Sequence, residues 1–153
     1  MIEFTEASVV YPNGFRALDK VSVTIEDGEF VVIVGLSGAG KSTMLRAVNG
    51  LVPIVEGSVK VDGQEVVGAT AAELRNLRSG VGMIFQTFNL VNRARVVNNV
   101  LMGRLSKVPR WRSLLGMWPA EDKELALQAL ERVGIVDKAY QRASNLSGGQ
   151  QQR

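Results

Sequence analysis

The sequence of 153 residues contains no cysteine and no histidine. Disulfide bonds and thiolate metal sites are therefore excluded, and no imidazole can serve as general base, metal ligand or pH sensor. Long hydrophobic runs are also missing. The longest, Phe30 to Val34, is far shorter than the roughly 20 residues that cross a bilayer. The N-terminal "MIEFTEASVV" has neither a basic segment nor an apolar core, so we expect no signal peptide, and any membrane connection must run through a partner.

What is present is the composition of an ordinary globular domain. Hydrophobic residues make up 46% of the chain and charged residues 22%, which suffices for one domain with a hydrophobic core. The net charge of +3 is too small to favour nucleic acid as a partner by itself.

The chain changes character near residue 87. Before it, apolar alternation or continuous β-branched runs predict strands, and 3.6-residue periodicity predicts helices. The expected strands are 2–11, 21–25, 30–34, 58–63 and 81–85, of which 30–34 and 81–85 should be buried on both faces, and the expected helices are 41–48 and 71–78. After it we expect helices at 96–105 and 120–133, a loop at 106–119 and a helix beginning near Gly148. We therefore expect a nucleotide-binding α/β core at 1–86 and a mainly helical part at 87–153.

The stretch "GLSGAGKST", Gly35 to Thr43, fits the pattern G-x-x-x-x-G-K-[ST] between an expected strand and an expected helix. Phosphate oxygens need converging N–H donors, and glycines at Gly35, Gly38 and Gly40 permit positive φ and close approach of the backbone. A Gly-rich turn with a chance lysine is the competing interpretation, but motif and context agree. The residues expected to bind nucleotide here are Gly35, Ser37, Gly38, Ala39, Gly40, Lys41, Ser42 and Thr43.

Two side chains of this loop have distinct expected roles. Lys41 places a positive charge near the β- and γ-phosphates, and the Ser42 hydroxyl is a ligand for Mg²⁺. The following helix directs the positive end of its dipole at the phosphates. The sequence therefore predicts binding of a nucleoside triphosphate.

Three further features resemble the ATP-binding cassette (ABC) family. "LSGGQ", Leu146 to Gln150, is identical to the signature motif of that family, Gln86 matches its Q-loop glutamine, and Tyr11 falls where the family has an aromatic residue that stacks on adenine. Each also has a plain interpretation: a turn aromatic at Tyr11, a surface glutamine at Gln86, and a helix N-cap at Ser147. Their order and spacing favour the family.

The resemblance covers nearly the whole chain and implies a P-loop NTPase core with an inserted helical subdomain. It implies ATP and Mg²⁺ as cofactors, with Ser42 and Gln86 near the metal and the attacking water. It also implies a head-to-tail homodimer in which the signature of one subunit closes over nucleotide held by the other. The signature residues expected to bind that nucleotide are Ser147, Gly148, Gly149 and Gln150.

A narrower resemblance lies in 83–105 and 111–153, above all in the stretch "GRL…WRSLLG". These segments resemble the ATPase subunit of bacterial phosphonate importers. This implies a peripheral protein on the cytoplasmic face of the bacterial plasma membrane, bound to an integral permease. A periplasmic binding protein would deliver the solute, and an importer for another small solute is the alternative.

Parts that hydrolysis requires are missing between Gln86 and Arg153. In the family, an apolar strand ending in Asp-Glu follows the signature and positions Mg²⁺ and water, and a histidine follows later; this chain has neither. We therefore expect a fragment of a longer cassette that lacks the C-terminal part of the core, with apolar surface and strand edges uncovered. We expect it to bind nucleotide and hydrolyse it poorly. A non-hydrolysing nucleotide-binding module is the alternative; a cassette acting on nucleic acid or the ribosome would need a second cassette or an added domain.

The segment from Arg93 to Arg112 carries six basic residues and no acidic ones. It is either a solvated basic face or a surface near the permease and anionic lipid headgroups. Nucleic acid is a third interpretation, but we find no recognised nucleic-acid module. These basic residues are Arg93, Arg95, Arg104, Lys107, Arg110 and Arg112.

Overall fold

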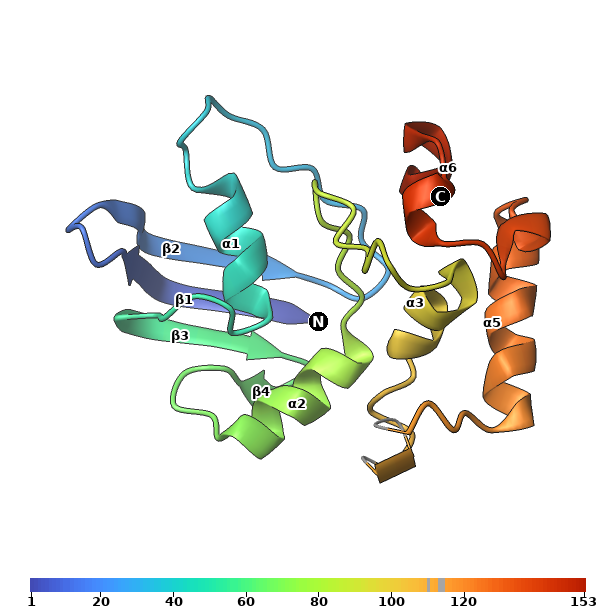
Figure 1. Cartoon of the computed structure of the whole chain (residues 1–153). Helices are drawn as coiled ribbons and strands as arrows, with labels where there is room; N and C mark the ends of the chain where they lie inside the picture. The colour runs from blue at the N-terminus through green and yellow to red at the C-terminus, as the bar shows by residue number, and fades with distance from the viewer. Residues whose placement is uncertain (110, 113–114) are drawn as a thin grey trace. The chain divides into compact units, whose positions relative to one another are not determined.

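The computed structural model describes residues 1–109, 111–112 and 115–153 (Figure 1). These residues form two compact units, Met1–Gly82 and Met83–Arg153. Each unit is described by itself below.

The first unit is built on a sheet with strand order β2-β1-β3-β4, in which every neighbouring pair is antiparallel (Figure 1). The register places Ile2 of β1 opposite Ile25 of β2 and Val61 of β3, so that β1 is paired on both edges. A register shift after Phe4 coincides with a positive φ of 49° at Glu6. The strands are β1 (Ile2–Val10), β2 (Arg16–Ile25), β3 (Glu56–Val61) and β4 (Gln64–Glu65).

Two helices complete this unit, α1 (Lys41–Val48) and α2 (Ala71–Gly80). The bounds of α1 are those predicted from the sequence. A capping box between Thr70 and Glu73 starts α2, because each residue's side chain bonds to the backbone N–H of the other. The core joins the sheet to the buried faces of both helices. It consists of Phe4, Ala7, Val9, Leu18, Ala47, Val48, Val52, Val59, Val61, Val66 and Leu77.

The two runs expected to form buried strands, 30–34 and 81–85, do not form strands, and this prediction was wrong. Their side chains are largely open to solvent: Phe30 is 92% exposed and Ile84 is 99% exposed. A strand buried on both faces needs hydrogen-bonded neighbours at its edges, and the four described strands pair only among themselves. The uncovered apolar surface that the sequence predicted is therefore present in both runs.

The second unit is helical, with α3 (Val96–Met102), α5 (Ala120–Arg132) and α6 (Gly148–Gln152), joined by the short 3₁₀ helices η1 (Val136–Lys138) and η2 (Ala143–Asn145). Helix α3 ends three residues before the predicted Leu105. The buried cluster of this unit consists of Val96, Val97, Leu101, Ala126, Leu130, Ile135, Ala139 and Leu146. Among the residues that the structure describes, no helix is long and apolar enough to cross a membrane.

An ion pair ties the turn after α3 to the start of α5. The Arg104 Nε donates to the Asp122 carboxylate at 2.7 Å, and the Asp122 side chain is 6% exposed. Asp122 also lies in the first turn of α5, where the helix dipole favours a negative charge. The stretch "WRSLLG" lies partly outside the described residues, because Ser113 and Leu114 are not among them.

Candidate nucleotide-binding site

The loop before α1 is shaped by two glycines in the left-handed region. Gly38 has a φ of 85° and Gly40 a φ of 83°, as the motif predicted. Gly35 does not have a positive φ, so the first reason given for a glycine there was wrong. The second reason, close approach, applies, since a Cβ at Gly35 would lie 3.3 Å from the Cβ of Ala39.

Gly40 is also the point where the loop touches the sheet. A Cβ at this position would lie 2.3 Å from the carbonyl oxygen of Ala17 and 3.0 Å from Cδ2 of Leu18, both in β2. Only glycine therefore allows the first turn of α1 to rest on β2. Sequence reasoning missed Ala17 and Leu18, because no local pattern links them to a loop more than twenty residues later.

Lys41 places its ammonium group on the loop itself. Its Nζ donates to the carbonyl oxygens of Gly35 at 2.8 Å and Leu36 at 2.7 Å. The next side chain, Ser42, is exposed, and Thr43 is 7% exposed. The positive charge and an accessible hydroxyl thus lie next to each other at the start of α1.

The N-terminus of α1 leaves its positive end uncompensated. Gly40 is the N-cap and provides no side-chain cap, and the first turn contains no acidic residue. The free N–H groups, the dipole and the Lys41 ammonium all favour an anion, so the residues fit a polyphosphate. The described residues contain no group of three or more Asp, Glu, His or Cys that could hold a metal. The exposed Ser42 hydroxyl fits a ligand of Mg²⁺, an ion that commonly takes its other ligands from phosphate and water oxygens.

The structure brings Tyr11 to the phosphate loop. Tyr11 lies at the turn between β1 and β2, where its N–H donates to the Phe15 carbonyl and its own carbonyl accepts from the Gly14 N–H, both at 2.9 Å. Its ring packs against the core, and its hydroxyl oxygen lies 3.1 Å from Oγ1 of Thr43. Both residues were predicted to bind nucleotide, but no sequence signal indicated that they touch each other.

The signature motif forms the start of α6 in the second unit. The Ser147 Oγ accepts from the Gln150 N–H at 3.4 Å, and the Ser147 N–H donates to Gln150 Oε1 at 2.9 Å. The predicted N-cap role of Ser147 is therefore present, and the hydroxyl hydrogen stays available to donate to an anion. Gly148 and Gly149 are exposed. Gln86 is exposed and belongs to this second unit, whereas the phosphate loop belongs to the first.

The basic stretch is not uniform. Arg93, Arg95 and Lys107 are not engaged by any acidic side chain among the ion pairs of the described residues, whereas Arg104 is engaged by Asp122. The Arg112 guanidinium lies 5.2 Å from the centroid of the Trp111 ring, a cation–π contact. Arg110 lies outside the described residues.

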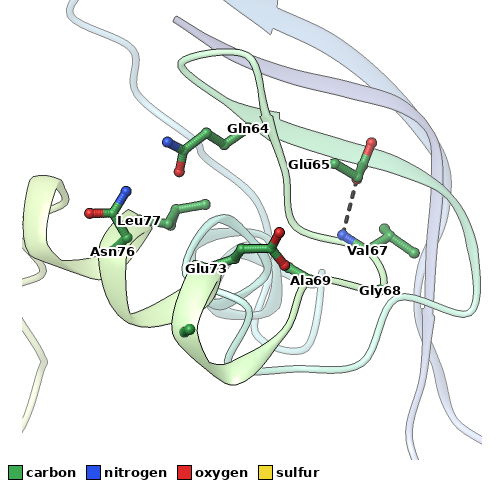
Figure 2. Close-up of a pocket in the computed structure, with 9 residues that line it drawn as sticks. Gln64, Glu65, Val67, Gly68, Ala69, Glu73, Asn76 and Leu77 are labelled. Carbon is green, nitrogen blue, oxygen red and sulfur yellow. Dashed lines mark hydrogen bonds between the residues drawn. The ribbon is translucent and has the colours of Figure 1, made fainter.

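A hollow of about 650 Å³ lies between β4 and α2 (Figure 2), and the residues that line it do not belong to the phosphate loop. Partial burial of the Glu65 carboxyl tends to raise its pKa. Hydrogen bonds from the Ser58 hydroxyl and from the N–H groups of Val67 and Val59 outweigh this effect, so the pKa of Glu65 is lowered. The Thr70 backbone and hydroxyl likewise lower the pKa of Glu73. Both carboxylates are thus engaged within the fold, and the hollow offers no acid–base pair.

A profile of the family described as "ABC transporter" matches residues 18–153. The chain belongs to the ABC transporter family. The predicted P-loop NTPase fold of the ABC ATPases is thereby confirmed, as is the family resemblance of the signature.

Among curated proteins, the chain is 54% identical to "Phosphonates import ATP-binding protein PhnC" of Bacillus thuringiensis subsp. konkukian. The identity is also 54% to "Phosphonates import ATP-binding protein PhnC 1" of Halalkalibacterium halodurans. Both alignments cover 100% of this chain and 60% of the relative. The chain thus spans about three fifths of the length of these relatives, which agrees with the expectation of a partial cassette.

Solved structures show the same fold. The ATP-binding cassette MJ0796, in a dimeric post-hydrolysis state bound to ADP and Pi, matches with a TM-score of 0.85 at 32% identity. That match covers 99% of this chain and 65% of the cassette. The ADP conformation of MJ1267, a cassette of another ABC transporter, matches with a TM-score of 0.76 at 28% identity and covers 99% and 60%.

Proposed function

We propose that the chain is the nucleotide-binding part of an ABC ATPase that couples ATP hydrolysis to import of phosphonate-type solutes. The observation that carries nucleotide binding is the phosphate loop, where Lys41 and the uncapped N-terminus of α1 offer converging positive charge. The names of relatives that are 54% identical over the whole chain support the solute class.

Positioning and electrostatics supply nearly all of the catalysis in phosphoryl transfer. In our proposal the Lys41 ammonium leaves the carbonyls of Gly35 and Leu36 and neutralises charge on the β- and γ-phosphates. Bound Mg²⁺ would supply further neutralisation, with the Ser42 hydroxyl as its protein ligand. Gln86 would orient the metal and the attacking water, and the ring of Tyr11 would stack on adenine.

We further propose that two copies associate head to tail around nucleotide. In each, the Ser147 hydroxyl and the backbone N–H groups of Gly148 and Gly149 would donate to the γ-phosphate held by the other copy, with Gln150 beside them. The capping box supports this role, since it leaves the hydroxyl hydrogen of Ser147 outside the box. The cassette MJ0796 is dimeric in its ADP- and Pi-bound state, which supports association of two copies by analogy.

The partners follow from this role. We propose an integral permease of the bacterial plasma membrane that the ATPase binds on the cytoplasmic face, a periplasmic binding protein that delivers the solute, and no nucleic acid. The permease and the binding protein would choose the solute, while this chain would supply the energy of ATP.

The first test is titration of the 153-residue chain with MgATP by calorimetry. We expect binding, with turnover near background because no Asp-Glu pair follows the signature within 153 residues. Lys41→Ala removes the ammonium and should weaken binding at least tenfold, on the order of 1.4 kcal/mol or more. Lys60→Ala, which removes an exposed lysine from β3, is the matched control and should bind like wild type.

Transport tests the rest of the proposal. In the full-length protein, Lys41→Ala and Ser147→Arg should each abolish ATP-driven phosphonate uptake by cells. Uptake that persists in both variants contradicts the importer role. Nucleotide binding without any turnover by the full-length protein would instead favour a non-hydrolysing module.

A further inference from the structure

Tyr11 is held through its backbone, its ring and its hydroxyl group. Its N–H and C=O are both bonded within the turn, to Phe15 and Gly14. The ring packs on the core of the first unit, and its hydroxyl meets Oγ1 of Thr43 at 3.1 Å. The orientation of this ring therefore depends on Thr43 as well as on its own turn.

Thr43 is the third residue of α1, so it moves with the phosphate loop. Its side chain is 7% exposed, and a buried hydroxyl without a partner is costly. The Tyr11 hydroxyl is the partner that the structure provides. The same hairpin meets the loop a second time, where Gly40 rests on the Ala17 carbonyl. The turn that holds the aromatic ring and the helix that holds the phosphates are thus joined at two places.

We infer that Thr43 is a positioning residue for the nucleotide base, acting through the hydroxyl of Tyr11. This inference rests on the proposed function, in which Tyr11 stacks on adenine. The hydrogen bond holds the ring at a fixed distance from the phosphate loop. The groups that bind the base and the phosphates therefore keep a constant position relative to each other. Loss of the Tyr11 hydroxyl frees the ring to rotate, and part of the binding contribution of the base is lost while the phosphate contacts stay in place. Loss of the Thr43 hydroxyl frees the ring in the same way but also alters the phosphate loop, so its effect on the base is measured as the ratio of the affinities for a ligand with the base and a ligand without it.

The test compares MgATP with inorganic tripolyphosphate, which has the phosphates but no base. Dissociation constants for both ligands are measured on the full-length protein for wild type, Tyr11→Phe, Thr43→Val and the double variant. Tyr11→Phe removes the hydroxyl but keeps the ring, and Thr43→Val removes the hydroxyl but keeps the side-chain volume. A further variant, Thr43→Ser, keeps the hydroxyl and serves as the conservative control. Melting temperatures confirm that each variant is folded, and Tyr11→Phe alone keeps the test informative if Thr43→Val fails to fold.

We expect each single variant to weaken MgATP binding by about 3- to 10-fold relative to tripolyphosphate, which corresponds to the loss of one hydrogen bond. The double variant should lose no more than either single variant, and Thr43→Ser should recover most of the loss. Losses that multiply in the double variant, or a ratio of the two affinities that does not change, overturn the inference and leave the proposed function standing. Wild-type protein that binds neither ligand overturns both.

Discussion

At the scale of single residues, Gly40 carries two separate constraints. Its φ of 83° disfavours any side chain, and a Cβ would lie 2.3 Å from the Ala17 carbonyl oxygen. Gly38 shares the first constraint, with a φ of 85°, but a Cβ there would have nothing within 4 Å. Substitutions at Gly38 and Gly40 therefore allow the cost of backbone strain to be measured apart from the cost of a steric clash.

Gly40→Ala should destabilise the first unit by about 3 kcal/mol, because α1 must lift away from β2 to make room. Gly38→Ala should cost about 1–2 kcal/mol, the strain of the left-handed conformation alone. Urea unfolding followed by circular dichroism measures both values. If the two variants lose the same free energy of unfolding, the close approach of Gly40 to the Ala17 carbonyl adds nothing to the cost, and the prediction is contradicted.

Residues of the phosphate loop could be found from the sequence because they are neighbours in the chain. Spacing alone predicted the left-handed backbone at Gly38 and the span of α1, while nucleotide binding by Lys41 stays a prediction. The contact between Tyr11 and Thr43 could not be found this way, since 32 residues separate them and only the folded sheet brings them together. The same holds for Ala17 beneath Gly40.

Glu65 adds a prediction about pH at this scale. Its folded pKa is lowered from 4.5, so its hydrogen bonds to Ser58, Val59 and Val67 stabilise the fold above pH 4.5. That contribution is lost as the pH falls from 4.5 through the lower folded value. We expect urea unfolding of Glu65→Gln to depend less steeply on pH in this acidic range than unfolding of wild type. If the free energy of unfolding of Glu65→Gln depends on pH as steeply as that of wild type, the pKa of Glu65 is the same in the folded and unfolded states, and the prediction is contradicted.

At the scale of elements, the ion pair between Arg104 and Asp122 joins the end of α3 to the start of α5. Asp122 is buried and Arg104 is 40% exposed on its side chain, so the pair lies between surface and core. This pair adds a charged contact to the apolar cluster that stabilises the helical unit.

Arg104→Met should destabilise the second unit by about 2 kcal/mol, because it leaves the buried Asp122 carboxylate without its cation. Lys138→Met is the control: its pair with Asp137 lies at the surface, with side chains that are 33% and 67% exposed, and should contribute less than about 0.5 kcal/mol. Denaturation followed by the fluorescence of Trp118, which packs on the same cluster, reports on this unit. A loss for Arg104→Met no larger than for Lys138→Met would contradict the role of the pair.

Element type was predictable wherever a segment could satisfy its own hydrogen bonds or pair with a nearby strand. Helices α1, α2 and α5, strands β1 and β3 and the second half of β2 were predicted from the sequence pattern, whereas the first half of β2, from Arg16, and the short β4 were not. The runs 30–34 and 81–85 have strand composition, yet composition cannot provide the neighbours that a strand needs. Their failure to form strands is a property of the sheet around them and not of their residues.

At the scale of the whole molecule, these two runs and the residues beside them expose apolar side chains in quantity. Phe30 is 92% exposed, Val34 and Leu36 are each 85% exposed, and Ile84 is 99% exposed. Exposed apolar side chains of this kind promote association with other apolar surfaces.

We therefore expect the 153-residue chain to bind the dye ANS and to self-associate with rising concentration in sedimentation velocity. The single variants Phe30→Ser and Val34→Thr should each lower both the ANS fluorescence and the self-association. Tyr140→Ser, at a residue that is 66% exposed elsewhere in the chain, should leave them unchanged. Signals that fall equally in all three variants would mean that exposure in general, and not the run at 30–34, is responsible.

The position of the sheet in the chain has a consequence for synthesis. All four described strands lie between Ile2 and Glu65, and each pairs with strands from that span alone. A sheet of this kind can form while the ribosome is still adding residues 83–153, which takes several seconds at about 5–20 residues per second. The surface on which α1 rests would then be complete before the signature motif has left the ribosome.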